Sequence, residues 1–200
     1  MVYKVCGMRN AENIREVSAL GIDLMGFIFW PKSSRYVSEP PSYLPTDCKR
    51  VGVFVDATLE DIRQHIHNYQ LDIVQLHGHE SPEFAKALKP AIIIKAFNIA
   101  TAEDLKQTRP YEGIADYFLF DTKAQLPGGS GEQFDWSVLS QYEGTTPFLL
   151  SGGIGPDDAE RIKAFNHERC IGIDLNSRFE LAPALKDVHQ LKEFLKKVKR

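Results

Sequence analysis

A regular alternation of short apolar runs with amphipathic segments constrains the fold of this 200-residue chain more than any other feature of its sequence. The apolar runs are rich in Val, Ile and Phe, and most are bounded by Gly, Pro, Asp or Asn, which is typical of buried strands. A segment with helical spacing of apolar residues follows almost every run. Strict alternation of strands and helices indicates parallel strands joined by right-handed crossovers.

The alternation repeats eight times and uses the whole length. Strands are predicted at residues 3–6, 24–29, 50–55, 73–77, 92–97, 117–121, 148–151 and 170–175. Helices are predicted at residues 10–20, 58–69, 81–88, 101–107, 135–141, 156–165 and 187–197, and segment 38–46, with three prolines, is the least helix-like candidate. Open doubly wound sheets more often have five or six strands, whereas eight units can close on themselves. We therefore predict one α/β domain over residues 1–200, a (β/α)8 (TIM) barrel with a parallel eight-stranded sheet; an open sheet is the alternative.

Charge and cysteine content limit the partners and the compartment. With 24 basic and 27 acidic side chains the net charge is -3, so no global basic field attracts nucleic acid or an anionic membrane. No apolar run approaches the ~20 residues of a membrane span, and the first residues lack a signal-peptide pattern. The three cysteines Cys6, Cys48 and Cys170 include no close pair, which is typical of a reducing compartment. We expect a cytoplasmic protein, monomer or homodimer, without nucleic-acid or membrane partners.

Polar and reactive side chains lie at the ends of several predicted strands or directly after them, at the end of a barrel where active sites lie. They are Cys6, Asp56, His77, Asp121, Ser151, Asp174 and Asn176. The two-residue period of a strand places Lys4 on the face of Cys6, and Gln75 on the face of His77. A lysine beside a cysteine in a barrel interior would favour the thiolate and lower the thiol pKa. The alternative for Cys6 is a small buried apolar residue, as we expect for Cys48 and Cys170.

Two turns after the last strands have the composition of a phosphate site. Gly152 and Gly153 follow the seventh strand, and Asn176 and Ser177 follow the eighth. Barrel loops at these places commonly bind phosphate through backbone N–H groups, although an ordinary tight turn is the alternative. A third glycine cluster fits neither a Walker nor a dinucleotide motif, and we predict that residues 125–131 form a lid. Arg35, after the second strand, would pair with a carboxylate or phosphate unless its loop is only solvated surface.

Two pairs of histidines have a spacing that could serve metal binding. His65 and His67 are two residues apart on a predicted helix and point to different sides. His77 and His79 could bind a metal with Asp121 or Asp174, but no further histidine follows another strand. The pattern favours no metal site.

Short stretches along essentially the whole chain resemble one enzyme family. They are KVCGM (4–8), GFIF (26–29), SSRYV (33–37), VGVFV (51–55), VQLHG (74–78), DT (121–122), GGSG (128–131), FDW (134–136), SGGI (151–154), GID (172–174) and KD (186–187). In this order they resemble the phosphoribosylanthranilate isomerases of tryptophan biosynthesis. After the eighth strand the family usually has Ser-Ser-Gly-Val-Glu, where this chain has Asn-Ser-Arg-Phe-Glu, so Arg178 replaces a glycine. Ser151 likewise replaces an alanine.

The resemblance implies a cofactor-free Amadori rearrangement of a small-molecule substrate, phosphoribosylanthranilate, to 1-(2-carboxyphenylamino)-1-deoxyribulose 5-phosphate. By similarity Asp121 is the general acid and Cys6 the general base. Arg35 and Asp174 would bind the anthranilate carboxylate and amine, with Gln75, His77 and Lys4 also at the substrate. The backbones of Gly152, Gly153, Asn176 and Ser177 would hold the phosphate. The alternatives are a metal-dependent hydrolase using His77, His79 and Asp174, and a non-catalytic phosphosugar-binding barrel, suggested by the altered loop at Arg178.

Overall fold

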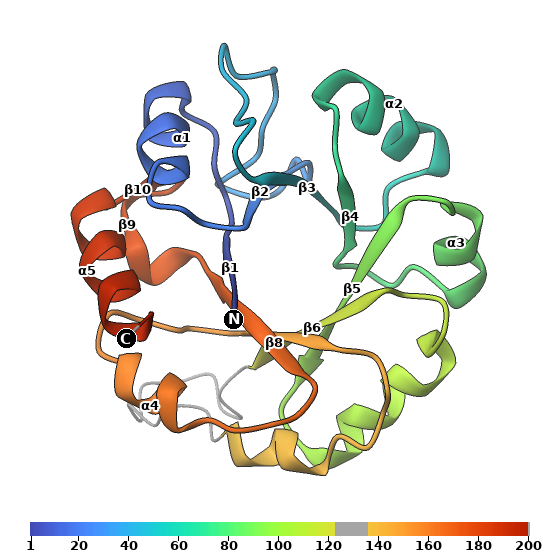
Figure 1. The fold of residues 1–200 in the computed structure, drawn as a ribbon. Helices are drawn as coiled ribbons and strands as arrows, with labels where there is room; N and C mark the ends of the chain where they lie inside the picture. Colours follow the sequence, from blue (N-terminus) through green and yellow to red (C-terminus); the bar gives the residue numbers. More distant parts are fainter. Residues whose placement is uncertain (123–135, 200) are drawn as a thin grey trace.

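Eight parallel strands close into one barrel in the computed structural model, which describes residues 1–122 and 136–199. The strands are β1 (Val2–Val5), β2 (Leu24–Ile28), β3 (Lys49–Phe54), β4 (Ile73–Leu76), β5 (Ile92–Ile99), β6 (Tyr117–Thr122), β7 (Phe148–Ser151) and β8 (Cys170–Leu175). Each pairs with its neighbour in sequence, and β1 pairs with β8 (Figure 1). The predicted closed barrel is confirmed, and the open sheet is wrong.

Helical segments surround the barrel on its outside (Figure 1). They are α1 (Ala11–Ser18), α2 (Leu59–Tyr69), α3 (Pro82–Ala87), η1 (Ala102–Tyr111), η2 (Trp136–Gln141), α4 (Ala159–Ala164) and α5 (Val188–Val198). Side-chain caps begin several of them: Asn10, Thr58 and Asp187 each accept a hydrogen bond from the backbone N–H three residues on. Such caps satisfy N–H groups that have no partner inside the helix. The apolar face of each helix then packs on the strands.

Three predicted helices differ from the structure. Segment 38–46 contains no helix, because three prolines lack the N–H that a helix interior requires. The segments predicted at 101–107 and 135–141 form the 3₁₀ helices η1 and η2, although residue 135 lies outside the described part. In η1, Pro110 cannot donate an i→i−4 bond, which favours the tighter turn. The proposed lid at residues 125–131 also lies outside the described residues.

A small hairpin after β8 was not predicted. The short 3₁₀ turn η3 (Ser177–Phe179) leads into β9 (Glu180–Ala182), which pairs antiparallel with β10 (Leu185–Lys186). Phe179 packs on Phe194 of α5 with ring centroids 4.9 Å apart. On the other side, the Asn13 side chain of α1 binds both the N–H and the C=O of Lys186. The hairpin is therefore anchored between α1 and α5 (Figure 1).

The seam between β1 and β8 closes the barrel. Val2 lies opposite Gly172, and Lys4 opposite Asp174. At Gly172 there is no room for a side chain, because a Cβ atom would lie 2.1 Å from the backbone oxygen of Val2.

We expect Gly172→Ala to lower the free energy of unfolding by about 3 kcal/mol, since the clash is with backbone that cannot move without opening the seam. Urea unfolding followed by circular dichroism measures the change. Gly113→Ala is the matched control: its φ is +74° but no atom lies within 4 Å of the added Cβ. The control should therefore lose only about 1 kcal/mol, from backbone strain. Equal losses in the two variants would contradict a steric seam.

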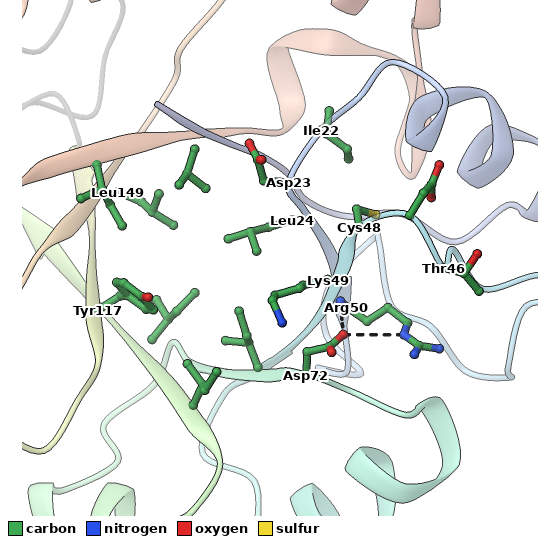
Figure 2. A pocket seen from close by; sticks show the side chains of 16 residues that line it. Ile22, Asp23, Leu24, Thr46, Cys48, Lys49, Arg50, Asp72, Tyr117 and Leu149 are labelled. Atoms are coloured by element: carbon green, nitrogen blue, oxygen red, sulfur yellow. Dashed lines mark hydrogen bonds and ion pairs between the residues drawn. The ribbon is translucent and has the colours of Figure 1, made fainter.

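A cavity of about 570 Å³ opens at the N-terminal mouth of the barrel. Figure 2 shows apolar side chains of the strands, among them Leu24, Tyr117 and Leu149, with the Arg50–Asp72 pair at the rim. Although this cavity is large, we do not expect it to be the active site, because barrel enzymes react at the opposite mouth, where the strands end. Among the described helices, none has the length and apolar character that a bilayer crossing needs.

Candidate active site

A smaller cavity of about 160 Å³ lies at the C-terminal mouth, where the strands end. It is lined by Cys6, Ile28, Val53, Gln75, His77, Asp121, Ser151, Gly152, Gly153, Ile154, Asp174, Asn176 and Ser177. Nine of the eleven residues predicted for the site are in this lining. Of the other two, Lys4 pairs with Asp174 of the lining, whereas Arg35 is linked to Asn176 of the lining only through Glu180 and Lys186. One cavity therefore brings together side chains from six strands and from the loops that follow them.

The floor of the cavity holds a buried ion pair beside Cys6. The Lys4 ammonium lies 2.8 Å from Oδ1 of Asp174, across the β1–β8 seam, and both side chains are buried. The Ser151 hydroxyl donates to the other carboxylate oxygen at 3.2 Å. Burial lowers the pKa of Lys4, but the charges of Asp174 and Cys6, together with hydrogen bonds to both, raise it above its ordinary value. Lys4 therefore stays protonated next to the thiol.

The expectation of a lowered thiol pKa at Cys6 is wrong. The Cys6 side chain is buried, and burial raises its pKa above the ordinary value of a cysteine. Lys4 opposes this effect by charge and by a hydrogen bond, and Lys186 opposes it by charge, whereas Asp174 adds to it. Lys4 favours the thiolate as expected, but its charge is shared with Asp174.

A polar chain leads from β4 to Asp121 on β6. The Gln75 amide Nε2 lies 2.9 Å from His77 Nδ1, and His77 Nε2 lies 3.7 Å from Asp121 Oδ2. If Gln75 donates to Nδ1, a neutral His77 carries its proton on Nε2, the nitrogen that faces Asp121. The Gln75 Oε1 atom is buried and accepts no hydrogen bond within the described part of the chain. That oxygen is an open acceptor at the cavity.

The backbone around His77 is fixed by a second buried ion pair. Lys95 of β5 lies 3.1 Å from Glu80 Oε2 and donates to the Gly78 carbonyl at 2.7 Å. Glu80 in turn accepts from the Gly78 N–H and from the N–H of Asp56. Both backbone groups of Gly78 are thus held, which keeps the adjoining His77 at the cavity.

The turn after β7 has the backbone that close approach to an anion requires. Gly152 and Gly153 have φ values of +94° and +69°, a region that side chains disfavour. The altered loop after β8 lies beside it: Arg178 Nε would be 3.4 Å from a Cβ atom on Gly155. Arg178 is exposed, while Phe179 is buried against α5. The loop therefore follows a 3₁₀ turn that places Ser177 in the cavity lining.

Arg35 lies across Gly7 and binds Glu180. Its Nε donates to both carboxylate oxygens at 2.9 and 3.0 Å, and its Nη2 donates to Oε2 at 2.6 Å. Lys186 Nζ donates to Glu180 Oε1 and, at 2.8 Å, to Asn176 Oδ1. Lys186 is in one of the stretches that carry the family resemblance, and Glu180 ends the altered loop after the eighth strand. Neither was predicted to have a role, because the hairpin was not predicted.

The geometry does not support the metal-dependent hydrolase. His79 points away from the cavity, since its side chain is 96% exposed and pairs with Asp56 at 3.2 Å. Within residues 1–122 and 136–199, no cluster of three His, Cys, Asp or Glu side chains is arranged to hold a metal ion.

Comparisons with known proteins show which family the chain resembles. A family model described as N-(5'-phosphoribosyl)anthranilate (PRA) isomerase matches residues 3–197. The N-(5'-phosphoribosyl)anthranilate isomerases of Parabacteroides distasonis and Phocaeicola vulgatus are 53% and 50% identical, over 99% and 100% of this chain and 93% and 98% of theirs. A phosphoribosyl anthranilate isomerase solved in complex with reduced 1-(o-carboxyphenylamino)-1-deoxyribulose 5-phosphate is 31% identical, with a TM-score of 0.82 over 100% of this chain and 99% of that one. This chain belongs to the N-(5'-phosphoribosyl)anthranilate isomerase family.

Proposed function

We propose that Cys6 and Asp121 are the general base and general acid of this isomerase, which acts in tryptophan biosynthesis. One observation carries the proposal: the two side chains come from strands three places apart around the barrel wall, yet line the same 160 Å³ cavity. An acid and a base on different sides of a small cavity can address two atoms of one sugar. The rearrangement of phosphoribosylanthranilate to 1-(2-carboxyphenylamino)-1-deoxyribulose 5-phosphate needs such a pair.

Asp121 acts first in this scheme. Its protonated carboxyl donates to the furanose ring oxygen, the C1'–O bond breaks, and the anthranilate nitrogen supplies the electron pair that forms the Schiff base. The carboxylate left behind faces His77 Nε2 at 3.7 Å. That distance is too long for a hydrogen bond but short enough for favourable charge interaction with a polar N–H.

Cys6 then removes the C2' proton as a thiolate. The electrons of the C–H bond move into the C1'–C2' bond and neutralise the iminium nitrogen, which gives an enolamine. Lys4 and Lys186 favour the thiolate by their positive charge. Tautomerisation of the enolamine moves a proton from the C2' hydroxyl to C1' and yields the ketone.

The two ends of the substrate have complementary groups in the cavity lining and beside it. The backbones of the Gly152–Gly153 turn and of Asn176 and Ser177 suit the phosphate. Arg35 suits the aromatic carboxylate, and Asp174 the amine. Gln75 Oε1, an open buried acceptor, suits a substrate hydroxyl or N–H.

The direct test is conversion of phosphoribosylanthranilate by the purified chain, followed by the fall in anthranilate-type fluorescence. Turnover that needs neither added metal nor cofactor supports the proposal. Tight binding without turnover would support the non-catalytic phosphosugar-binding barrel instead.

The reducing cytoplasm is the compartment we propose, which the three free cysteines support.

The pH dependence of the same assay should report the raised pKa of Cys6. Only the thiolate accepts the C2' proton, and burial raises the thiol pKa above its ordinary value. We therefore expect kcat/KM, which reflects the free enzyme, to keep rising with pH through and beyond about 8.5, the ordinary thiol pKa. Cys48→Ser, at the other mouth of the barrel, should leave the rise of kcat/KM with pH unchanged. A plateau already reached at pH 7.5 would contradict the prediction.

A further inference from the structure

We propose that Glu180 and Lys186, from the hairpin after β8, are positioning residues that orient the Arg35 guanidinium for the substrate carboxylate. The inference rests on the proposed role of Arg35 and adds to it the residues that set substrate affinity at this end of the cavity. The three side chains come from two segments about 145 residues apart.

Glu180 holds Arg35 by geometry as well as charge. Three hydrogen bonds of 2.6 to 3.0 Å join the guanidinium edge formed by Nε and Nη2 to the carboxylate. Such two-pronged pairing fixes the plane of the guanidinium, which a single charge contact does not. The Glu180 side chain is 5% exposed and that of Arg35 is 21% exposed, so little water competes for these bonds.

Lys186 lowers the free-energy cost of burying the Glu180 carboxylate. Its side chain is fully buried, and its ammonium binds Glu180 and Asn176. Its backbone is held on both sides by Asn13. A buried charge without partners would cost several kcal/mol, so Lys186 and Glu180 depend on each other. Together with Arg35 they form a cluster of two cations and one anion.

The cluster of Arg35, Lys186 and Glu180 carries one net positive charge, and the Nη1 edge of the Arg35 guanidinium has no partner within it. No residue in the described ranges accepts a hydrogen bond from Nη1 of Arg35, and burial allows only part of the side chain to reach water. Gly7 leaves the space that the Arg35 side chain occupies, because a Cβ there would lie 2.6 Å from Cδ of Arg35. The Arg35 side chain is thus confined between Gly7 and the Glu180 carboxylate. A second carboxylate, that of the anthranilate ring, satisfies the open edge and balances the charge.

The test compares Glu180→Gln with the parent enzyme. The amide keeps the shape but loses the charge and one acceptor, so the guanidinium is no longer fixed. We expect KM to rise about tenfold with kcat within about twofold, which corresponds to about 1.4 kcal/mol of binding. Inhibition by free anthranilate should weaken by the same factor, whereas inhibition by inorganic phosphate, which probes the other end of the cavity, should not change.

Arg35→Gln separates this inference from the proposed function. If Arg35→Gln leaves anthranilate inhibition unchanged, the proposed role of Arg35 itself fails. If Arg35→Gln weakens it but Glu180→Gln does not, only the positioning role of Glu180 is overturned. When both act through one contact, adding Glu180→Gln to Arg35→Gln has no further effect on anthranilate inhibition.

Two more variants complete the test. Glu160→Gln removes an exposed carboxylate that pairs with Lys163, and it should leave both inhibition constants and KM unchanged. If Glu180→Gln does not fold, Glu180→Asp keeps the charge that Lys186 needs but withdraws the carboxylate by one methylene, and the same loss of anthranilate affinity is expected. A variant that weakens phosphate and anthranilate equally, or lowers kcat alone, would show a merely structural role.

Discussion

Cys6→Ser should lower kcat by about 10²–10⁴-fold, because a serine hydroxyl is far harder to deprotonate than a thiol and cannot supply the base that removes the C2' proton. The substitution changes one buried atom at the end of β1, so the fold should persist. The fluorescence assay measures the loss, and circular dichroism checks the fold.

Binding separates this effect from a damaged cavity. Inorganic phosphate and anthranilate should inhibit Cys6→Ser with the constants of the parent enzyme, since neither contact involves proton removal. Cys48→Ser is the matched control: it makes the same chemical change at the opposite mouth and should keep full activity. Near-parent turnover by Cys6→Ser would remove Cys6 from the mechanism.

Asp121→Asn should produce a loss of similar size, about 10²–10⁴-fold in kcat, for a different reason. The amide fills the same volume but has no acidic proton, so the furanose ring opens slowly. Asp47→Asn, at an exposed position by the N-terminal mouth, is the matched control and should retain activity.

The two losses can be told apart with substrate deuterated at C2'. In Cys6→Ser the slow step is removal of that hydrogen, so a primary kinetic isotope effect on kcat should be fully expressed. In Asp121→Asn ring opening is slow and comes first, so the isotope effect should fall towards unity. A large isotope effect in Asp121→Asn, or none in Cys6→Ser, would contradict the assignment of acid and base.

The sequence predicts the barrel well because its strands are separated by clear turn residues and are predominantly apolar. Residues at the end of a strand, such as Cys6 and Asp121, could therefore be placed at the active-site mouth of the barrel from the order of the strands alone. Both lie in the cavity lining, as expected from the position of barrel sites. The predicted strand bounds differ from the observed ones by no more than two residues at either end.

What the sequence could not predict depends on contacts between distant segments. Glu180 and Lys186 follow the last strand without a recognisable period, and nothing local shows that they return to Arg35. The pKa of Cys6 is a second case: the sequence shows Lys4 two residues away, but the opposing burial and the Asp174 charge appear only in the folded structure. The helices predicted at 101–107 and 135–141 are 3₁₀ helices in the structure, and the reason is local. Amphipathic spacing does not distinguish an α-helix from a 3₁₀ helix in so few residues.

The seam between β1 and β8 has a consequence for how the protein is made. Lys4 and Asp174 meet across it although 170 residues separate them in sequence, so their contact has one of the highest loop-closure costs in the chain. A ribosome that has released only the first seven strands has produced Cys6 and Asp121 but neither the partner of Lys4 nor the anchor of Arg35. Catalytic competence therefore arrives only after β8 and the hairpin that follows it have been synthesised, in the same step that closes the barrel.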